Sequence, residues 1–164
     1  MATVTYLSFQ SGKIIKVSGQ DVLHQIERTE KKTFARLEAF AFSTELKKRN
    51  HELIVIADDV VTHECKVALV AYMVIAHAKN TNMVHLHKIC VQKGFRRQGV
   101  GARLLIAYIE KLKKQGAVQI QLWFDESNTP ARLLYEKVGF EEVRRLDNYY
   151  ASSRVGVQML MSLV

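Results

Sequence analysis

The sequence predicts one mixed α/β domain. The chain has 164 residues, of which 48% are hydrophobic and 24% charged, a balance typical of a globular protein. Apolar runs with the period of a strand alternate along the chain with segments that have the period of a helix. There is a single proline, Pro130, and no repeat or flexible linker divides the chain. We therefore expect one domain over residues 1–164.

The first part of the chain predicts a strand and two helices. Val4–Phe9 alternates weakly and is interpreted as an opening strand. Asp21 is a candidate helix cap, ahead of the apolar positions Val22 and Ile26. Phe34–Lys48 has its apolar residues at helical spacing, which predicts a second helix.

Three strands are predicted in the middle of the chain. Leu53–Ala57 is an apolar run rich in β-branched residues. Lys66–Ala78 is apolar enough to be buried on both faces of a sheet. His85–Val91 is the third strand.

The remaining segments continue the alternation. Gly101–Gln115 predicts the clearest helix, with Gly116 at its end. Val118–Phe124 alternates as a strand does. Asn128-Thr129-Pro130 starts a helix that stops at Gly139. Closing strands are predicted at Phe140–Arg145 and Gly156–Met161.

Charge points to an anionic partner. The chain carries 24 Lys and Arg against 16 Asp and Glu, a formal net charge of +8. Residues 85–164 hold 13 basic and 7 acidic side chains, a net charge of +6, and residues 1–84 have a net charge of +2. Nucleic acid, a membrane surface and a phosphate-rich small molecule all fit this asymmetry.

We expect the chain not to belong to several classes of protein. The longest apolar stretch is too short to span a bilayer, and Met1–Gln10 does not resemble a secretory signal. Cys65 and Cys90 are too few for a disulfide framework or a cysteine-rich zinc site, so we expect two reduced thiols. These features predict a cytoplasmic protein without a metal.

A glycine loop joins a strand to the strongest helix. Lys93–Gly101 contains Gly94, Gly99 and Gly101, and glycine lets the backbone approach a ligand closely. The following helix turns free N–H groups toward the loop, where its dipole favours an anion. Such a loop suits a pyrophosphate. Neither the dinucleotide fingerprint nor the Walker pattern is matched.

Two motifs in this order resemble the GNAT acyltransferase superfamily. Arg96-Arg97-Gln98-Gly99-Val100-Gly101 is similar to its acetyl-CoA pyrophosphate loop. Asn128-x-x-Ala131-x-x-x-Tyr135-x-Lys137-x-Gly139-Phe140 resembles its later helix motif. The likeness extends over roughly Leu53–Phe140. It implies the GNAT fold, with a central mixed, twisted, mostly antiparallel sheet, a parallel pair at the acetyl-CoA cleft, and about four flanking helices.

The resemblance implies an acetyl-CoA-dependent N-acetyltransferase that transfers the acetyl group directly to a primary amine. Tyr135 stands where the family has the acid that protonates the leaving thiolate. Asn128 stands where the family binds the pantetheine arm, although it can equally cap its helix. The other cofactor-binding positions implied are Ile89, Cys90, Val91, Arg96, Arg97, Gln98, Gly99, Val100, Gly101 and Ala102.

His85 and His87 are the candidate bases for the amine. They are two residues apart on a predicted strand and so share a face. An imidazole with a pKa near 6.5 is suited to taking a proton at neutral pH. The His-x-His resembles that of arylalkylamine N-acetyltransferases. A zinc site is disfavoured, because no further ligands cluster nearby in sequence.

Two subfamilies with different acceptor amines stay possible. Asn148-Tyr149-Tyr150 resembles a motif of protein N-terminal acetyltransferases, which implies a hairpin over an α-amino substrate. Phe34 could stand at their peptide-contacting loop, and Trp123 replaces a Glu or His that these enzymes often carry. Trp123 could also form one wall of a pocket for a small amine, such as an arylalkylamine or polyamine.

Partners follow from these alternatives. We expect acetyl-CoA and either a protein N-terminus or a small amine, and no membrane. The ribosome or an auxiliary subunit could present a protein substrate. RNA binding without catalysis is the distant alternative, disfavoured because no aromatic pair interleaves the basic residues.

Overall fold

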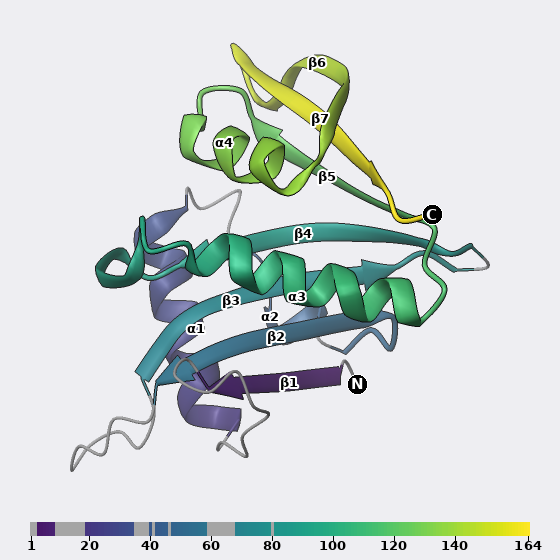
Figure 1. Cartoon of the computed structure of the whole chain (residues 1–164). Helices are drawn as coiled ribbons and strands as arrows, with labels where there is room; N and C mark the ends of the chain where they lie inside the picture. The colour runs from purple at the N-terminus through teal and green to yellow at the C-terminus, as the bar shows by residue number, and fades with distance from the viewer. Residues whose placement is uncertain are drawn as a thin grey trace. The chain divides into compact units, whose positions relative to one another are not determined.

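A computed structural model describes residues 3–8, 19–34, 40, 42–45, 47–58, 68–79 and 81–164. The chain divides into two compact units. The first unit comprises Met1–Val74 and Lys88–Val100, and the second comprises Ile75–His87 and Gly101–Val164. Figure 1 labels the helices and strands along the chain.

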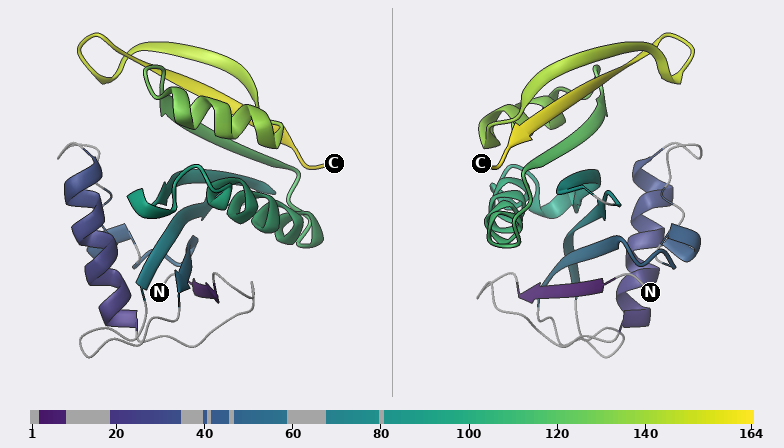
Figure 2. Two further views of the ribbon diagram at one scale, coloured as in Figure 1. Left: turned by 60° about the vertical axis from the view of Figure 1, so that its left-hand side comes forward. Right: turned by 90° about the vertical axis from the view of Figure 1, so that its right-hand side faces the viewer.

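The first unit has the strand order β1-β2-β3-β4. Its elements are β1 (Thr3–Ser8), α1 (Gly19–Thr33), α2 (Phe42–Glu45), β2 (His51–Asp58), most of β3 (Ala68–His77), the end of β4 (Met83–Val91) and the short 3-10 helix η1 (Lys93–Phe95). β1 and β2 are parallel. Helix α1 covers one face of β2 and β3 (Figures 1 and 2).

The core of the first unit joins α1 to the sheet. It contains nine buried residues, and Leu23, Phe34 and Phe40 pack against them. Within it the rings of Phe42 and Tyr72 meet edge to face with centroids 5.9 Å apart. The nine residues are Val22, Ile26, Phe42, Leu53, Val55, Leu69, Tyr72, Val74 and Cys90.

The second unit has the strand order β4-β5-β7-β6. It contains the first part of β4, nearly all of α3 (Val100–Lys114), β5 (Gln119–Asp125), α4 (Thr129–Val138), β6 (Glu141–Ala151) and β7 (Arg154–Ser162). β4 and β5 are parallel from Met83↔Gln119 to Leu86↔Leu122. β7 is antiparallel to both β5 and β6.

Strand β5 shows how the second unit is layered. Ile120, Leu122 and Phe124 are buried, whereas Gln119, Gln121, Trp123 and Asp125 alternate with them and are half-buried. Helix α4 lies along the buried face (Figure 2). The Tyr135 ring of α4 lies 5.7 Å from the ring of Phe124 and 5.8 Å from that of Phe140. The other face of β5 therefore carries polar and aromatic side chains that α4 does not cover.

Most predicted elements are confirmed within a few residues. β3 runs over Ala68–His77, and its buried run extends from Leu69 to Ala76, as a strand buried on both faces requires. α3 begins at Val100 and is followed by Gly116 with a φ of 78°. α4 ends at Gly139, whose φ of 105° is that of a left-handed helix cap. The parallel pair is β4 and β5.

Four details differ from the sequence predictions. Asp21 lies inside α1, which starts at Gly19. No single helix covers Phe34–Lys48: α1 stops at Thr33, the described helix α2 is only Phe42–Glu45, and residues 35–39, 41 and 46 lie outside the described residues. β1 and β2 add a second parallel pair. β6 continues past Arg145 to Ala151, because it pairs with β7. Phe9 and Cys65 also lie outside the described residues.

Candidate functional site

The loop after β4 is held by its own side chains. Arg96 has extended backbone angles, and its Nε donates to the Val91 carbonyl at 2.9 Å. Gln98 Nε2 donates to the Gly94 carbonyl at 3.0 Å. Both contacts lie within the first unit. They fix the loop before the chain enters α3.

The backbone of this loop turns sharply at Arg97 and Gly99, with φ values of 62° and 74°. Arg96, Arg97, Gln98 and Gly99 are exposed, whereas Val100, Gly101 and Ala102 are buried at the start of α3. A Cβ placed on Gly99 would meet nothing within 4 Å, so the backbone there is open on its outer side. Exposed cations beside a helix N-terminus suit an anionic group such as a pyrophosphate.

The strand before the loop ends in a buried thiol. Ile89 and Val91 are half-buried, and Cys90 is 5% exposed. Burial raises the pKa of the Cys90 thiol, and a hydrogen bond with Tyr72 only partly offsets this. A thiol with a raised pKa is a poor nucleophile. The environment of Cys90 therefore fits direct transfer to the amine better than a cysteine-bound intermediate.

Beside Cys90 lies a buried carboxylate that the sequence analysis did not single out. Glu30 of α1 is 2% exposed and accepts hydrogen bonds from the Tyr72 hydroxyl, from Lys88 Nζ at 2.7 Å and from the Phe40 amide at 2.9 Å. Burial raises the pKa of Tyr72, which keeps its hydroxyl protonated as a donor. This carboxylate ties α1 to β3, to β4 and to the chain at Phe40.

Phe34, a predicted substrate contact, lies directly after α1. Its amide donates to the Glu30 carbonyl at 2.9 Å, and Lys88 Nζ lies 3.7 Å from the centre of its ring. The ring is half-buried against the core of the first unit. These contacts give Phe34 a structural role, and its contact with a substrate stays a prediction.

His85 and His87 lie on β4 in the second unit, with their rings stacked and the centroids 6.2 Å apart. His85 pairs with Gln121 of β5 in the strand register. Gln121 Nε2 lies 3.0 Å from His85 Nδ1 and 2.9 Å from His85 Nε2. The side-chain oxygen of Gln121, Oε1, accepts a hydrogen bond from Gln158 Nε2 of β7 at 2.8 Å. Gln158 thus orients the Gln121 amide so that its nitrogen faces the imidazole.

Burial lowers the pKa of His85 from its usual value of 6.5. An amide N–H can donate only to a ring nitrogen that carries no proton. Both effects favour the neutral imidazole at neutral pH, which is the form that can accept a proton. His87 is exposed, whereas His85 is half-buried against Gln121, so His85 has the more specific environment.

An aromatic group lies on the same face of β5 as Gln121. Trp123 is two residues further along the strand, and its ring stacks on that of Tyr149 with centroids 4.4 Å apart and a 10° angle. Tyr150 meets Tyr149 edge to face at 4.9 Å. The structure therefore brings together the predicted substrate contacts Trp123, Tyr149 and Tyr150. Tyr149 is 45% exposed, so part of its ring is open to a ligand.

The tyrosines lie within β6 rather than after it. Asn148 has a φ of 56°, and the pairing of β6 with β7 shifts register between Leu146 and Ala151. The Asn148 side chain accepts from the Ser153 amide at 2.8 Å, which closes the hairpin. The predicted end of this strand at Arg145 was wrong, because β6 continues through this bulge to Ala151.

Arg154 anchors the same hairpin to β5. Its Nε donates to Asp125 Oδ2 at 2.5 Å, and its guanidinium lies 5.4 Å from the Tyr150 ring. Burial alone would raise the pKa of Asp125, but hydrogen bonds from Ser127 and Arg154 hold it below its usual value. The carboxylate stays ionised, and the ion pair with Arg154 holds the hairpin against the end of β5.

Tyr135 lies on the opposite face of β5 from His85. Its ring packs on Phe124, whereas His85 meets Gln121, and side chains an odd number of residues apart point to opposite faces of a strand. Tyr135 is 6% exposed, and burial raises the pKa of its phenol. The phenol is therefore protonated at neutral pH, as an acid must be. The structure does not place the two catalytic candidates on one face.

Asn128 is the N-cap of α4. Its Oδ1 accepts from the Ala131 amide at 3.2 Å, and Pro130 lies in the first turn. The capping interpretation is confirmed. A contact of Asn128 with pantetheine stays a prediction.

Neither a membrane-spanning helix nor a group of metal ligands is found among the described residues. Over those residues, no helix combines the length and the apolar character needed to cross a membrane. In the same part of the chain, no three His, Cys, Asp or Glu side chains are grouped so that they could hold a metal ion.

Comparison with known proteins decides the family. The sequence model of the acetyltransferase (GNAT) family matches residues 20–140, which is most of the chain. The chain belongs to the acetyltransferase (GNAT) family.

The curated relatives of this GNAT chain match over a shorter range. An N-alpha-acetyltransferase from Sulfurisphaera tokodaii is 41% identical over 68 residues, which cover 41% of each chain. The ribosomal protein bS18-alanine N-acetyltransferase of Escherichia coli is 38% identical over 68 residues, or 42% of this chain and 46% of the relative. The chain thus spans less than half the length of these relatives.

Solved structures match over nearly the whole GNAT chain. The ribosomal-protein-S18-alanine N-acetyltransferase from Escherichia coli has a TM-score of 0.70 at 22% identity, covering 92% of this chain and 93% of its own. Arabidopsis thaliana NAA60 in complex with a bisubstrate analogue has a TM-score of 0.75 at 17% identity, covering 90% and 95%. These matches show the fold.

Sequence reasoning missed the residues that support the GNAT candidates. Gln121 contacts both His85 and Gln158 only because β4, β5 and β7 are neighbours in the register found here. The alternation of Val118–Phe124 puts Gln121 and Trp123 on one face of a strand, and that pattern is the only signal the sequence offers for them. No sequence signal marks Glu30, because its neighbours along the chain do not indicate that it is buried.

Proposed function

We propose that this protein is an N-acetyltransferase that moves the acetyl group of acetyl-CoA to the α-amino group of a protein or peptide. One observation carries the proposal: in a GNAT chain, the His85 imidazole contacts Gln121 on the face of β5 where Trp123 stacks on Tyr149 of the β6–β7 hairpin. The names of the Sulfurisphaera and Escherichia relatives support the choice of a protein α-amine.

In this proposal His85 receives the proton that the acceptor ammonium must lose. The neutral imidazole is suited to this step, because Gln121 donates to it and Gln158 holds Gln121 in place. The amine lone pair then attacks the thioester carbonyl, and the carbonyl carbon becomes tetrahedral. Trp123 and Tyr149 line the same face and contact the first residues of the acceptor.

Tyr135 supplies the second proton. When the tetrahedral intermediate collapses, the carbon–sulfur bond breaks, and the phenol protonates the thiolate of CoA. Attack and departure occur at different sides of the reacting carbon. The positions of His85 and Tyr135 on opposite faces of β5 support this division of roles. The nitrogen of the intermediate loses its extra proton to water as the amide forms, the phenolate is reprotonated from water, and His85 returns its proton to water.

The exposed loop before α3 fits the phosphates of acetyl-CoA. Arg96 and Arg97 supply charge, Gly99 lets the backbone turn, and Val100 begins the helix. Acetyl-CoA supplies the activated acetyl group. Backbone contacts of Ile89, Cys90 and Val91 with the thioester arm are part of the proposal.

The test is an acetylation screen with purified protein and acetyl-CoA. The panel holds peptides with varied first residues, including ribosomal-protein N-termini, together with N-terminally blocked lysine peptides, arylalkylamines and polyamines. We expect turnover of peptides with a free α-amine. In Tyr135→Phe, kcat should fall by about 10²-fold or more with little change in KM, because only the leaving-group proton is lost.

Three results would contradict the proposal. Turnover of small amines alone would assign the chain to the other subfamily. Full kcat in Tyr135→Phe would remove the role of its hydroxyl. Affinity for RNA with a steep salt dependence, and none for acetyl-CoA in calorimetry, would favour a binding module over an enzyme.

A further inference from the structure

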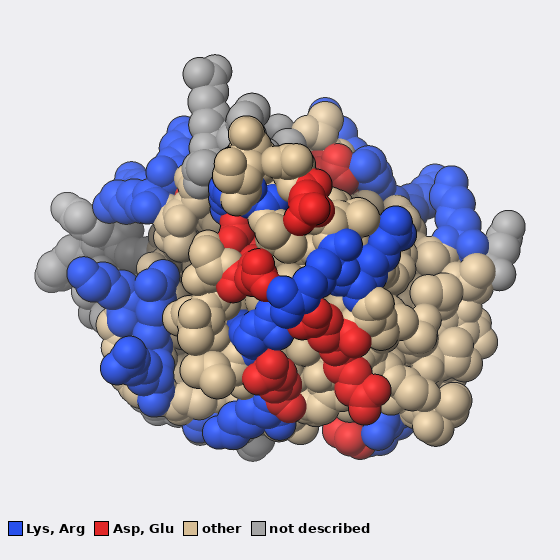
Figure 3. All heavy atoms as spheres, turned by 90° about the horizontal axis from the view of Figure 1, so that it is seen from above, with Lys and Arg blue, Asp and Glu red and all other residues tan. Residues whose placement is uncertain are grey.

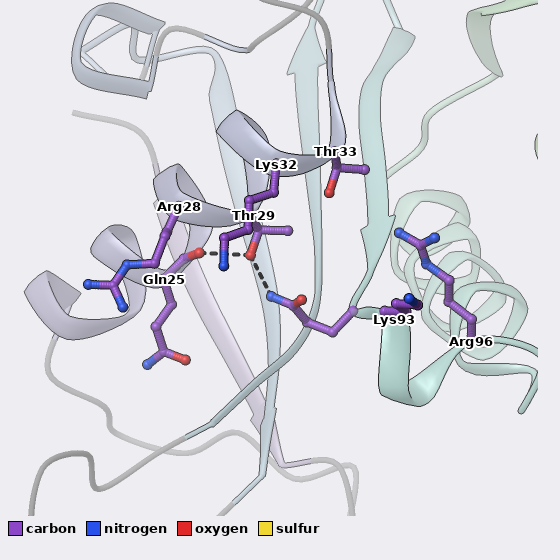
Figure 4. A pocket seen from close by; sticks show the side chains of 8 residues that line it. Gln25, Arg28, Thr29, Lys32, Thr33, Lys93 and Arg96 are labelled. Carbon is purple, nitrogen blue, oxygen red and sulfur yellow. Dashed lines mark hydrogen bonds between the residues drawn. The ribbon is translucent and has the colours of Figure 1, made fainter.

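A basic hollow lies in the first unit, between α1 and the segment that follows β4 (Figure 4). Its volume is about 600 Å³. Four of its lining side chains are cations, and no lining residue is acidic. The lining residues are Gln25, Arg28, Thr29, Lys32, Thr33, Gln92, Lys93 and Arg96.

The base of the hollow is fixed by hydrogen bonds between its two sides. Thr29 Oγ1 accepts from Gln92 Nε2 at 2.5 Å and donates to the Gln25 carbonyl at 2.8 Å (Figure 4). Gln25 Oε1 accepts from the Leu69 amide at 3.0 Å, which adds a contact to β3. The two sides that carry the cations are therefore held at a set separation.

Repulsion among the four cations destabilises this part of the fold. Arg28 and Lys32 are one turn apart on α1, and like charges at this spacing destabilise a helix. Lys93 and Arg96 face the hollow from the other side, and the Nε of Arg96 is bound to the Val91 carbonyl. Within the described residues no ion pair is found for any of the four. A multiply charged anion would offset their repulsion and accept hydrogen bonds from both sides.

The hollow overlaps the loop expected to hold the phosphates of acetyl-CoA at only two residues. Five of its eight lining residues come from α1, and Lys93 and Arg96 also belong to the Lys93–Gly101 loop. Gly99, Val100 and Gly101, which carry the backbone N–H groups of that motif, do not line it. A concave site with cations on both sides suits a compact ligand better than an extended strand of nucleic acid.

We propose that this hollow binds a small polyvalent phosphate anion, such as a polyphosphate or a multiply phosphorylated metabolite, in addition to acetyl-CoA. The inference goes beyond the acetyltransferase activity and does not depend on which amine is acetylated. Its ligand class follows from the four cations, the absence of a lining acid, and the polar base formed by Thr29 and Gln92.

The test is calorimetric titration of inorganic triphosphate into the full chain, free and saturated with acetyl-CoA. We expect saturable binding in both states. Arg28→Gln/Lys32→Gln should weaken triphosphate binding by at least about tenfold, since it removes two charge-assisted contacts. Lys113→Gln/Lys114→Gln removes the same charge from the exposed end of α3 and should leave the affinity within about twofold.

Each alternative has its own signature. No saturable binding, or equal weakening in both double variants, would overturn the proposal. If acetyl-CoA displaces triphosphate and Arg28→Gln/Lys32→Gln binds acetyl-CoA more weakly, the hollow serves the phosphates of CoA and the separate site is wrong. The free-protein titration reads out the hollow even if the chain acetylates nothing, so the two proposals fail independently.

Discussion

The imidazole of His85 meets a single amide nitrogen with both of its ring nitrogens, 2.9 and 3.0 Å away. The ring of His87 is stacked against it, with the centroids 6.2 Å apart. From β5 it faces the neutral amide of Gln121, which Gln158 of β7 contacts in turn. Since burial lowers its pKa below 6.5, activity that needs the neutral ring should fall only at acidic pH.

Gln121→Glu is the sharpest test of this arrangement. A carboxylate in place of the amide would stabilise the imidazolium, so the pKa of His85 should rise. The acid limb of the kcat/KM profile should then move to higher pH by about one unit or more. The same rise should be visible in an NMR titration of the His85 ring, which needs no activity. His87→Gln serves as the control.

Two outcomes would count against a role for Gln121. An unmoved NMR titration of His85 would show that the amide does not govern its protonation. A shifted titration with an unmoved pH profile would show that His85 is not the base. Gln121→Leu, which only removes the donor, should shift the profile in the same direction by less.

At the residue scale, the sequence identifies the candidate catalytic and substrate-binding side chains. It does not identify the side chains that position them. His85, His87, Trp123 and Tyr135 stand out by residue type or motif. Gln121 and Gln158 are ordinary polar residues until the strand register places them 2.8 Å apart. Register depends on pairing between distant segments, and one strand's pattern does not contain that information.

Among the elements, the hairpin of β6 and β7 owes its shape to Gly156. A Cβ added there would lie 2.5 Å from Cγ of Tyr149, closer than any real contact. The Tyr149 ring therefore rests on bare backbone, and this position lets it stack on Trp123. Close approach, rather than an unusual φ, is what requires glycine at this point.

Gly156→Ala should displace Tyr149 from the Trp123 stack. We expect KM for peptides to rise about tenfold, since one aromatic contact is disturbed, while the affinity for acetyl-CoA stays unchanged. Trp123 is the single tryptophan, so its fluorescence should report the displacement directly. Gly94→Ala is the matched control, because a Cβ there meets nothing within 4 Å. Unchanged fluorescence and KM in Gly156→Ala would contradict the role of the stack.

Sequence patterns predicted elements well where a local signal fixed them. α4 was predicted from Asn128, Pro130 and Gly139, and all three have the expected positions. The same reasoning failed for Phe34–Lys48, because apolar residues at helical spacing there serve a core between a bend and a short helix. It also ended β6 too early, since the bulge at Asn148 is tolerated only through pairing with β7.

The basic side chains behind the net charge of +8 differ in their surroundings: some lie beside acidic side chains and others do not. On the face seen in Figure 3, acidic and basic side chains interleave. In the second unit, Arg132 and Arg145 both pair with Glu142, and Arg145 also pairs with Glu126. The hollow in the first unit holds four cations without a lining acid. The sequence alone could count these charges, but it could not show which of them lie beside an acidic side chain and which gather around the hollow. That the units form one domain stays a prediction.

The first unit depends on one buried ion pair for its assembly. Glu30 and Lys88 come from segments 58 residues apart, and their side chains are 3% and 11% exposed. Glu30→Gln removes the negative charge that Lys88 and the Tyr72 hydroxyl both contact in a buried site, which should lower the free energy of unfolding by about 3–5 kcal/mol. Urea denaturation followed by circular dichroism measures the loss.

The double variant Glu30→Gln/Lys88→Met separates the charge from the packing. Methionine fills the space of the Lys88 stem without a charge, so the double variant should regain part of the stability lost in Glu30→Gln. Such a recovery would show that the charge of Lys88, and not its packing, caused the loss. A double variant that is less stable than Glu30→Gln would instead mean that Lys88 is held by Phe34 and its other surroundings, and that the ion pair does not join α1 to β4.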